Sequence, residues 1–471
     1  MRDTTSKIFY LFAILSCIAV TVCAVTDHLA LALAITLLPF FFIILALSFA
    51  NRLYAFMLLF VVNYFIPVLE HYITGGSLGI LMDIAIIFNI VVIVAGAMFE
   101  KPDFSRISKE LILAIGVWVL YCLAEVLNPR MRDIRAWLST IRNMALYFLL
   151  VTILVQLCVK DLKQLRSILL LWSILVLVSI AKAAFQKYVG FTPGDKYFLN
   201  VMDGKRTHLI YYGTRYFSIF SDAANFGGSM GLATVVFTAV GLHTPGLLKK
   251  SYYFIVAALA CYGMFISGTR SALVVPVAGI LTYLALVKDF KKMVPVSLVL
   301  AGVVFVLAFT TLGNSNTTIR RARTVFNRNE DLSYLIRKEN QSKLRQIMES
   351  YPFGNSLGMS AGRAKRYGDF SPLTDIPTDS WFVQIWVETG IAGQLLYFLL
   401  MGFIFIKGGI IIFFRLKKPE IKGLCAGMLA GVAGLFVMSS NNEVFTQFPN
   451  GVIVYTLIAI VFMAEKIENE S

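Results

Sequence analysis

The sequence predicts an all-α polytopic membrane protein with about fourteen (12–14) transmembrane helices. Of its 471 residues, 58% are hydrophobic and only 15% are charged, which leaves little soluble mass. Apolar stretches long enough to cross a bilayer recur along the whole chain. We therefore expect one membrane domain over residues 1–471.

The apolar stretches define the predicted spans in chain order. They are residues 8–25, 29–50, 53–70, 78–99, 111–128, 137–159, 167–187, 216–242, 253–268, 271–287, 294–312, 381–414, 423–440 and 450–464. The first is interpreted as an uncleaved helix because further spans follow it at once. The stretch 381–414 is too long for one straight helix, so Gly390, Gly393 or Gly402 is expected to break or tilt it.

Only two outer loops have any size. The shorter, residues 188–215, is rich in turn-forming residues and mixed charge. The longer, residues 313–380, contains Leu335, Leu344, Ile347 and Met348 at near-helical spacing among basic residues, until Pro352 stops the pattern. We expect a basic amphipathic helix over the outer mouth of the bundle.

The distribution of Lys and Arg sets the orientation. Turning the most basic short loops toward the cytoplasm places both termini inside, and much of the net charge of +15 then lies in turns that face anionic lipid. The charge therefore does not indicate nucleic-acid binding. Several basic residues nevertheless fall on the outer side: Arg130, Arg132, Arg135, Arg142, Lys205, Arg206, Arg215 and Arg270. They predict an anionic ligand at that face.

Ionisable residues inside the spans support this interpretation. Asp83, Glu125, Arg142, Lys182, Asp222, Arg270 and Glu388 all lie in the outer half of their predicted helices. Because charges in lipid usually face a wet interior, the pattern indicates a cavity that opens outward. Snorkelling toward the interface is the alternative for Lys182 and Lys407. All six cysteines lie in apolar spans, which indicates neither disulfides nor a thiolate metal site.

Three stretches carry a family resemblance together. They are Arg215–Gly228, Ser267–Leu273, and Tyr351–Gly358 followed by Thr378–Gly393. In this order and placement they resemble the O-antigen ligase and O-antigen polymerase superfamily, over roughly residues 200–460. The resemblance implies a GT-C-like helical bundle in the bacterial inner membrane. It also implies transfer of a glycan from an undecaprenyl diphosphate carrier to an acceptor hydroxyl at the periplasmic face.

Arg215 and Arg270 are the candidates for binding the diphosphate. A lipid diphosphate gains charge as the glycosidic bond breaks, and guanidinium groups match phosphate oxygens while staying ionised. We expect arginines in place of a metal ion, and no cofactor, because no acid-x-acid metal signature is found on the outer side. Each arginine is expected to begin a helix there; pairing with lipid headgroups is the alternative. Arg142 and Arg135 are further candidates.

Asp379 stands where ligases of this family commonly have a histidine before the helix that ends the long loop. A carboxylate there can take the acceptor proton or orient the acceptor, whereas an N-cap role at the start of the helix is the alternative. Glu388 is a second candidate for the acceptor side. Further candidates for substrate binding are Asp222, Asn225, His208 and Trp381.

The resemblance predicts glycosyl transfer, and the missing histidine favours a polymerase of surface polysaccharide repeat units. A ligase that joins polymer to lipid A-core uses the same donor, so it stays the alternative acceptor reaction. A transporter or flippase of lipid-linked glycan also needs an arginine-lined cavity, but it would show charges in both leaflets or pseudo-symmetric halves. Membrane lipids, the lipid-linked donor and the glycan acceptor are the expected partners.

Overall fold

The computed structural model describes residues 42–71, 79–98, 101–202, 204–210, 213–288, 332–365, 367–368 and 371–470, with positions 294, 298, 302 and 310. The predicted span 8–25, most of 29–50, almost all of 294–312 and the first part of the predicted loop 313–380 lie outside the described residues.

The described elements are mostly helices. Before the first predicted loop they are α3 (Arg52–Glu70), α4 (Ile80–Gly96), η1 (Phe104–Arg106), α5 (Lys109–Ala124), η2 (Glu125–Leu127), α6 (Ile134–Ile141), η3 (Arg142–Leu146), α7 (Tyr147–Cys158) and α8 (Leu162–Tyr188). The central elements are α9 (Pro193–Val201), α10 (Lys205–His208), β1 (Leu209–Ile210), β2 (Gly213–Thr214), α11 (Ala223–His243), α12 (Leu247–Ile266), η4 (Arg270–Leu273) and α13 (Val274–Leu286). The last are α16 (Leu332–Met348), α17 (Ala361–Lys365), α18 (Pro372–Asp375), α19 (Trp381–Ile410), η5 (Ile411–Arg415), α20 (Pro419–Met438) and α21 (Asn450–Asn469).

Eight helical stretches among the described residues are long and apolar enough to cross a membrane. They are Arg52–Glu70, Lys109–Leu127, Ile134–Cys158, Leu162–Tyr188, Ala223–His243, Trp381–Arg415, Pro419–Met438 and Asn450–Asn469. Two shorter apolar helices, Ile80–Gly96 and Arg270–Leu286, coincide with predicted spans. The predicted all-α membrane class is confirmed, whereas these residues do not establish a total of fourteen spans. The strands β1 and β2 form only a two-residue antiparallel pairing.

The prediction for the start of α11 is wrong. The helix begins at Ala223, not at residue 216, because the side chain of Asp222 accepts hydrogen bonds from the backbone N–H groups of Ala224 (2.7 Å) and Asn225 (3.0 Å). The apolar residues before it form turns, in which Ser218 has a φ of 58°. Phe217 and Phe220 are fully buried there. These apolar residues are buried in turns and not in a helix, which explains why hydropathy placed the start of the span too early.

The core of the bundle is built on α11, α20 and α21, whose side chains are buried on nearly every face. Helix α20 carries glycine at every fourth position, Gly423, Gly427 and Gly431, and small residues at this spacing let helices approach closely. A Cβ added at Gly427 would lie 2.2 Å from the Cβ of Ala239 on α11. Close backbone packing thus fixes α11 against α20.

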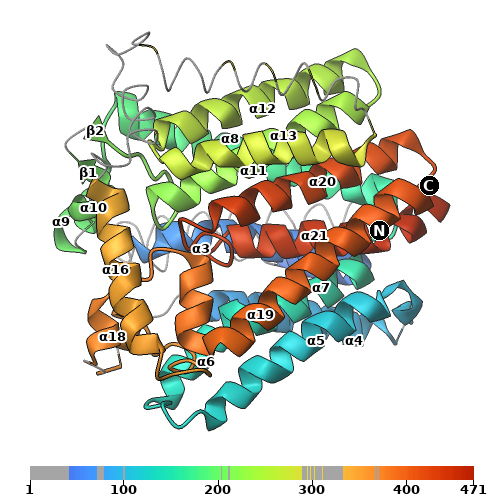
Figure 1. Ribbon diagram of the computed structural model, residues 1–471. Helices are drawn as coiled ribbons and strands as arrows, with labels where there is room; N and C mark the ends of the chain where they lie inside the picture. Colours follow the sequence, from blue (N-terminus) through green and yellow to red (C-terminus); the bar gives the residue numbers. More distant parts are fainter. Residues whose placement is uncertain are drawn as a thin grey trace, which may run out of the picture.

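The long helices lie alongside one another, and the short elements α9, α10, β1, β2, α16 and α18 gather at one end, on the left in Figure 1. We call this the α16 end. Helix α19 is interrupted near it, because Gly390 has φ 68° and ψ −173° in the middle of the helix. The break occurs at one of the three glycines for which the length of the apolar stretch predicted it.

Candidate functional site

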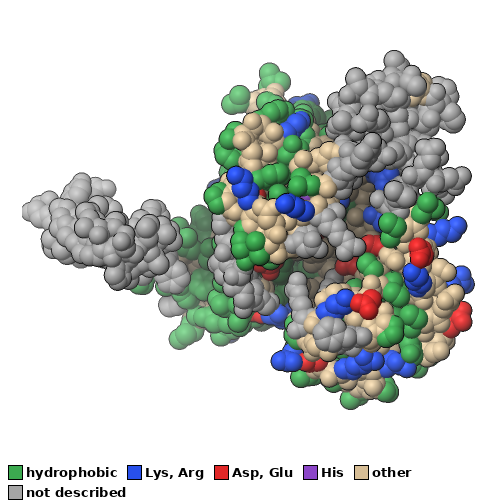
Figure 2. All heavy atoms as spheres, turned by 90° about the vertical axis from the view of Figure 1, so that its left-hand side faces the viewer, with side chains coloured by type: hydrophobic (Ala, Val, Ile, Leu, Met, Phe, Trp, Pro, Cys, Tyr) green, Lys and Arg blue, Asp and Glu red, His purple; other side chains and the backbone are tan. Residues whose placement is uncertain are grey.

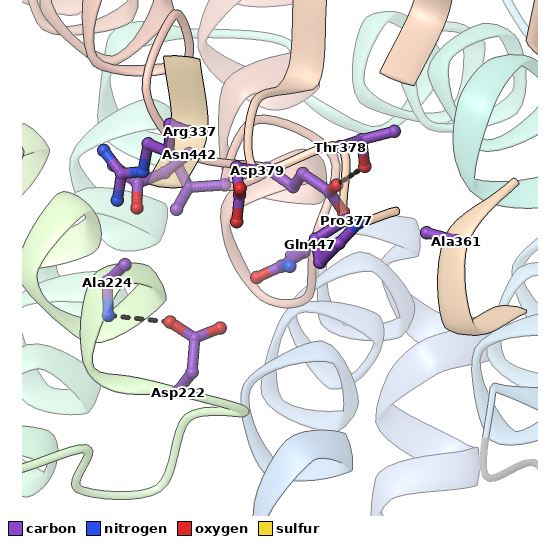
Figure 3. A pocket seen from close by; sticks show the side chains of 11 residues that line it. Asp222, Ala224, Arg337, Ala361, Pro377, Thr378, Asp379, Asn442 and Gln447 are labelled. Atoms are coloured by element: carbon purple, nitrogen blue, oxygen red, sulfur yellow. Dashed lines mark hydrogen bonds between the residues drawn. The ribbon is translucent and has the colours of Figure 1, made fainter. Parts of the chain in front are cut away.

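A cavity of about 250 Å³ lies at the α16 end. Its lining comes from the start of α11, from α16, from the segment before α19 and from the turn between α20 and α21. The lining residues are Asp222, Ala224, Arg337, Ala361, Pro377, Thr378, Asp379, Asn442, Glu443, Val444 and Gln447. Figure 3 shows Arg337 beside Asn442 and Asp379 on one side, with Asp222 across from them.

The turn of residues 439–449 forms one wall of the cavity and receives the start of α19. The backbone N–H of Trp381 donates to the carbonyl oxygens of Ser439 (3.1 Å) and Asn442 (3.2 Å). The hydroxyl of Thr378 donates to the carboxylate of Glu443. Carbonyl oxygens of the turn therefore bind the N–H of Trp381, the first residue of α19, whose N-cap makes no side-chain hydrogen bond.

Arg215 lies in the segment before α11, and neither it nor Arg270 lines the cavity. The Nη1 of Arg215 donates to the carbonyl oxygen of Thr207 (3.1 Å) and its Nη2 to the hydroxyl of Thr269 (2.8 Å), whereas its buried Nε has no hydrogen-bond partner within the described part of the chain. Burial lowers the pKa of the Arg215 guanidinium, the Asp222 carboxylate opposes this shift, and the positive charges of Arg337 and Arg270 add to it. Arg215, Arg270 and the cavity-lining Arg337 are therefore close enough to interact electrostatically.

Arg270 opens η4 two positions after Gly268, whose φ of 61° favours glycine. Its neighbour Ser271 accepts a hydrogen bond from the side chain of Asn442 at 2.5 Å. The cavity wall and the segment carrying Arg270 are thereby held together. Figure 2, which looks onto the α16 end, shows Lys and Arg side chains around this face and acidic side chains between them.

The structure places the two predicted arginines differently with respect to helix starts. Arg270 begins a short helix, as predicted. Arg215 does not, because it lies eight positions before the first residue of α11, Ala223. The prediction that the α11 N-terminus assists Arg215 directly is therefore wrong.

Asp379 lines the cavity and is not the N-cap of α19. Ser380 holds the N-cap position, and Asp379 precedes it with a φ of 57°, a left-handed conformation that Asp and Asn adopt more readily than most residues. The Asp379 carboxylate accepts a hydrogen bond from the Asn340 amide on α16 at 3.2 Å. This excludes the capping alternative for Asp379 and leaves its carboxylate facing the cavity.

Three other predicted binding residues are buried and already bonded. His208 is 1% exposed, with Nδ1 2.8 Å from the carbonyl oxygen of Gly204 and Nε2 accepting from the N–H of Ala223 at 3.3 Å. Burial lowers its pKa, so the imidazole stays neutral. Asn225 bonds to Ser221, Phe448 and Asn450. Trp381 donates to the hydroxyl of Tyr397. None of the three lines the cavity.

Glu388, Arg142 and Arg135 lie outside the cavity lining as well. Glu388 is fully buried and accepts from the hydroxyl of Ser360 at 2.5 Å. Arg142 forms an ion pair with Asp83. Arg135 pairs with Asp133 at 2.6 Å, and its side chain is 70% exposed.

Sequence reasoning missed Arg337, Asn442, Glu443 and Gln447 as site residues. The available signal was the run Asn441-Asn442-Glu443, which is polar between two strongly apolar spans. Arg337 stood among several basic residues of α16, and only packing distinguishes it from its neighbours. Helix α16 rests on α19 through Leu344, Met348 and Val387, which turns Arg337 toward the cavity.

A family model described as O-antigen ligase matches residues 255–398. This match supports the superfamily of O-antigen ligases and polymerases that the sequence motifs resemble. The matched superfamily segment supplies Arg270, Arg337 and Asp379, whereas Arg215 and Glu443 lie outside it. Together with the membrane-spanning helices, the match supports a membrane enzyme of the glycan-joining class, which takes a lipid-linked glycan and an acceptor in general. No curated protein matches the chain.

Proposed function

We propose that the protein transfers an undecaprenyl-diphosphate-linked oligosaccharide to a glycan acceptor, as a polymerase of surface polysaccharide repeat units such as O-antigen or capsule. The observation that carries this proposal is the gathering of Arg215, Arg270 and Arg337 beside a cavity lined by Asp222, Asp379 and Glu443. Cations that suit a diphosphate and carboxylates that suit a hydroxyl proton thus lie at one site.

On the donor side, the arginines stabilise the leaving diphosphate. The bond between the anomeric carbon and the diphosphate oxygen breaks, and its electron pair leaves with the phosphate. Charge on that oxygen grows in the transition state, where fixed guanidinium groups stabilise it more than they stabilise the ground state. The buried Nε of Arg215 is a donor for which the described residues supply no acceptor.

On the acceptor side, a carboxylate takes the proton of the attacking hydroxyl. The hydroxyl oxygen forms the new bond to the anomeric carbon as its proton passes to the carboxylate. Asp379 is our first candidate, since it faces the cavity from a position where the resemblance implies a histidine in ligases. Glu443 is the second, because it lines the same cavity. The aspartate in place of histidine favours a polymerase over a ligase.

We further propose that the α16 end faces the periplasm and that both termini lie in the cytoplasm. Basic residues at the opposite ends of the helices support this orientation, for example Arg166 beside Glu420 and Arg415 beside Glu465. Reporter fusions at the C-terminus test it. A C-terminal alkaline phosphatase fusion that is active would contradict the proposed topology.

Glycan profiling of a deletion strain tests the proposed reaction. A polymerase defect leaves single repeat units attached to their acceptor, whereas a ligase defect leaves long polymer on the lipid carrier. We expect single repeat units. A strain with unchanged lipid-linked and surface glycan would contradict both reactions, and accumulation of donor on the cytoplasmic leaflet would instead support a flippase.

Transfer by the purified protein should survive EDTA. The proposed charge compensation comes from arginines, so removal of divalent ions should change the initial rate by less than about twofold, well below the roughly hundredfold loss expected when one donor to a developing anion is removed. The rate should be measured with defined lipid, since anionic headgroups also bind cations. Activity that disappears with chelator and returns with Mg²⁺ or Mn²⁺ would contradict this part of the mechanism.

A further inference from the structure

The break of α19 at Gly390 is filled by another part of the chain. In a continuous helix the N–H of Ile391 would donate to the carbonyl oxygen of Val387. Here the N–H of Ile391 donates to the carbonyl oxygen of Pro352 (3.1 Å), and the carbonyl oxygen of Val387 accepts from the N–H of Asn355 (2.8 Å). The segment 352–355 thus takes over both halves of the missing helical hydrogen bond.

Side chains from the α5–α6 region hold the same segment from the other side. The amide of Asn128 donates to the carbonyl oxygen of Phe353 (3.1 Å), and the guanidinium of Arg130 lies 3.4 Å from the centre of the Tyr351 ring. The hydroxyl of Tyr121 donates to the carbonyl oxygen of Thr389, next to the break, at 2.7 Å. We call residues 351–360 together with this break the clasp.

The clasp has no room for side chains at its glycines. A Cβ at Gly390 would lie 2.0 Å from the carbonyl oxygen of Pro352, and a Cβ at Gly354 would lie 2.5 Å from the carbonyl oxygen of Glu388. Both glycines also have positive φ, 68° and 81°. Backbone therefore meets backbone, and even alanine at either position forces the two segments apart.

The clasp connects α16 to the first part of α19, and the contact between these two helices brings residues of α16 close to Asp379. Helix α16 ends at Met348, four residues before Pro352, and packs through Leu344 and Met348 against Val387 in the part of α19 that precedes the break. Asp379 stands just before that same part of α19. Arg337 and Asn340, three residues apart on α16, reach the cavity and the Asp379 carboxylate.

We infer that the clasp is a positioning device that sets α16 over the cavity, so that Gly354 and Gly390 act at a distance on Arg337 and Asn340. The inference that the clasp positions α16 rests on the hydrogen bonds and packing contacts described above. Its consequence for turnover rests on the proposed function, because only there does Arg337 take part in transfer. The experiment below measures the position of α16 and the transfer rate separately.

The position of α16 can be read by cross-linking in the full-length protein in membranes. An Asn340→Cys, Asp379→Cys pair, treated with a short bifunctional thiol reagent, reports whether α16 lies against the start of α19. Gly390→Ala is added to this pair, with Gly402→Ala as the matched control, because a Cβ at Gly402 of the same helix meets nothing within 4 Å. The transfer rate is measured in the glycine variants that retain Asn340 and Asp379.

We expect cross-linking to fall several-fold with Gly390→Ala and to stay unchanged with Gly402→Ala. Tyr121→Phe is a milder variant, since it removes only the hydroxyl that bonds to Thr389. If Gly390→Ala fails to fold, the cross-linking of Tyr121→Phe is compared with that of Gly402→Ala instead. Tyr121→Phe should give a smaller loss of cross-linking than Gly390→Ala. Cross-linking at the Gly402→Ala level in every variant that folds would overturn the inference.

The two readouts separate the clasp from the reaction. Reduced cross-linking together with reduced transfer, at normal membrane abundance, supports the inference in full. Reduced cross-linking with normal transfer supports the clasp as a positioning device but contradicts a role of Arg337 in transfer. Normal cross-linking with lost transfer overturns the inference and leaves the proposed function standing.

Discussion

Replacing Arg270 or Arg215 by alanine should abolish measurable glycan transfer while leaving the protein in the membrane. The two guanidinium groups are close enough to interact electrostatically, and loss of one donor to a developing anion costs about 10²–10³ in turnover. Arg337→Ala should behave similarly, because Arg337 lines the cavity itself. The transfer rate of purified variants on lipid-linked donor measures the effect, with membrane abundance checked by immunoblot.

Lysine at these positions should restore only part of the rate, since an ammonium group lacks the planar fork that binds phosphate oxygens in pairs. Arg135→Ala is the matched control. Its side chain is largely exposed, pairs with the neighbouring Asp133 and lines no part of the cavity. Full activity of both Arg270→Ala and Arg215→Ala at normal abundance would reject the proposed donor site.

Asp379→Asn should lower turnover by about 10²–10⁴-fold, the range of general acid–base catalysis, while donor binding persists. Asparagine tolerates the φ of 57° at this position, and its side-chain oxygen can still accept from Asn340. The variant therefore removes the basic carboxylate with little change in backbone or packing. Single-turnover rates and donor affinity should be measured on the same preparation.

Glu443→Gln provides the comparison, because Glu443 lines the same cavity from the turn between α20 and α21. If Asp379→Asn stays active and Glu443→Gln does not, Glu443 is the acceptor-side base. Asp379→Ala is less informative, because alanine in a left-handed conformation adds backbone strain of order 1–3 kcal/mol. Normal turnover in both amide variants would reject a carboxylate base in this cavity.

Hydropathy predicted the membrane class and most helix positions, since lipid-spanning helices must be long and apolar. The break at Gly390 was also predictable, because the apolar stretch is too long for one span and contains glycines. The start of α11 was not. Aromatic residues such as Phe217 and Phe220 are buried in turns rather than in a helix, and hydropathy does not distinguish the two.

Only those residues of the candidate site that lie within the sequence motifs were predictable. Arg215, Arg270 and Asp379 follow from the motifs, but the packing that brings Arg337 and Glu443 to the same cavity joins segments far apart in the chain. His208 and Asn225 illustrate the opposite error. His208 lies shortly before the Arg215–Gly228 motif and Asn225 lies within it, yet their hydrogen bonds are made within the fold, and the sequence does not show which partners fold against them.

The size of the cavity has a consequence for the proposed polymerase reaction. At about 250 Å³ it is smaller than the roughly 300–1,000 Å³ of pockets that enclose small-molecule ligands. Only the atoms around the reacting bond fit inside, so most of a lipid-linked oligosaccharide lies beyond the walls. A chain of two repeats and a chain of twenty then present the same end to the carboxylates. In the proposed polymerase reaction, product length then depends on how long the growing chain stays bound outside this cavity, not on recognition at the point of bond formation.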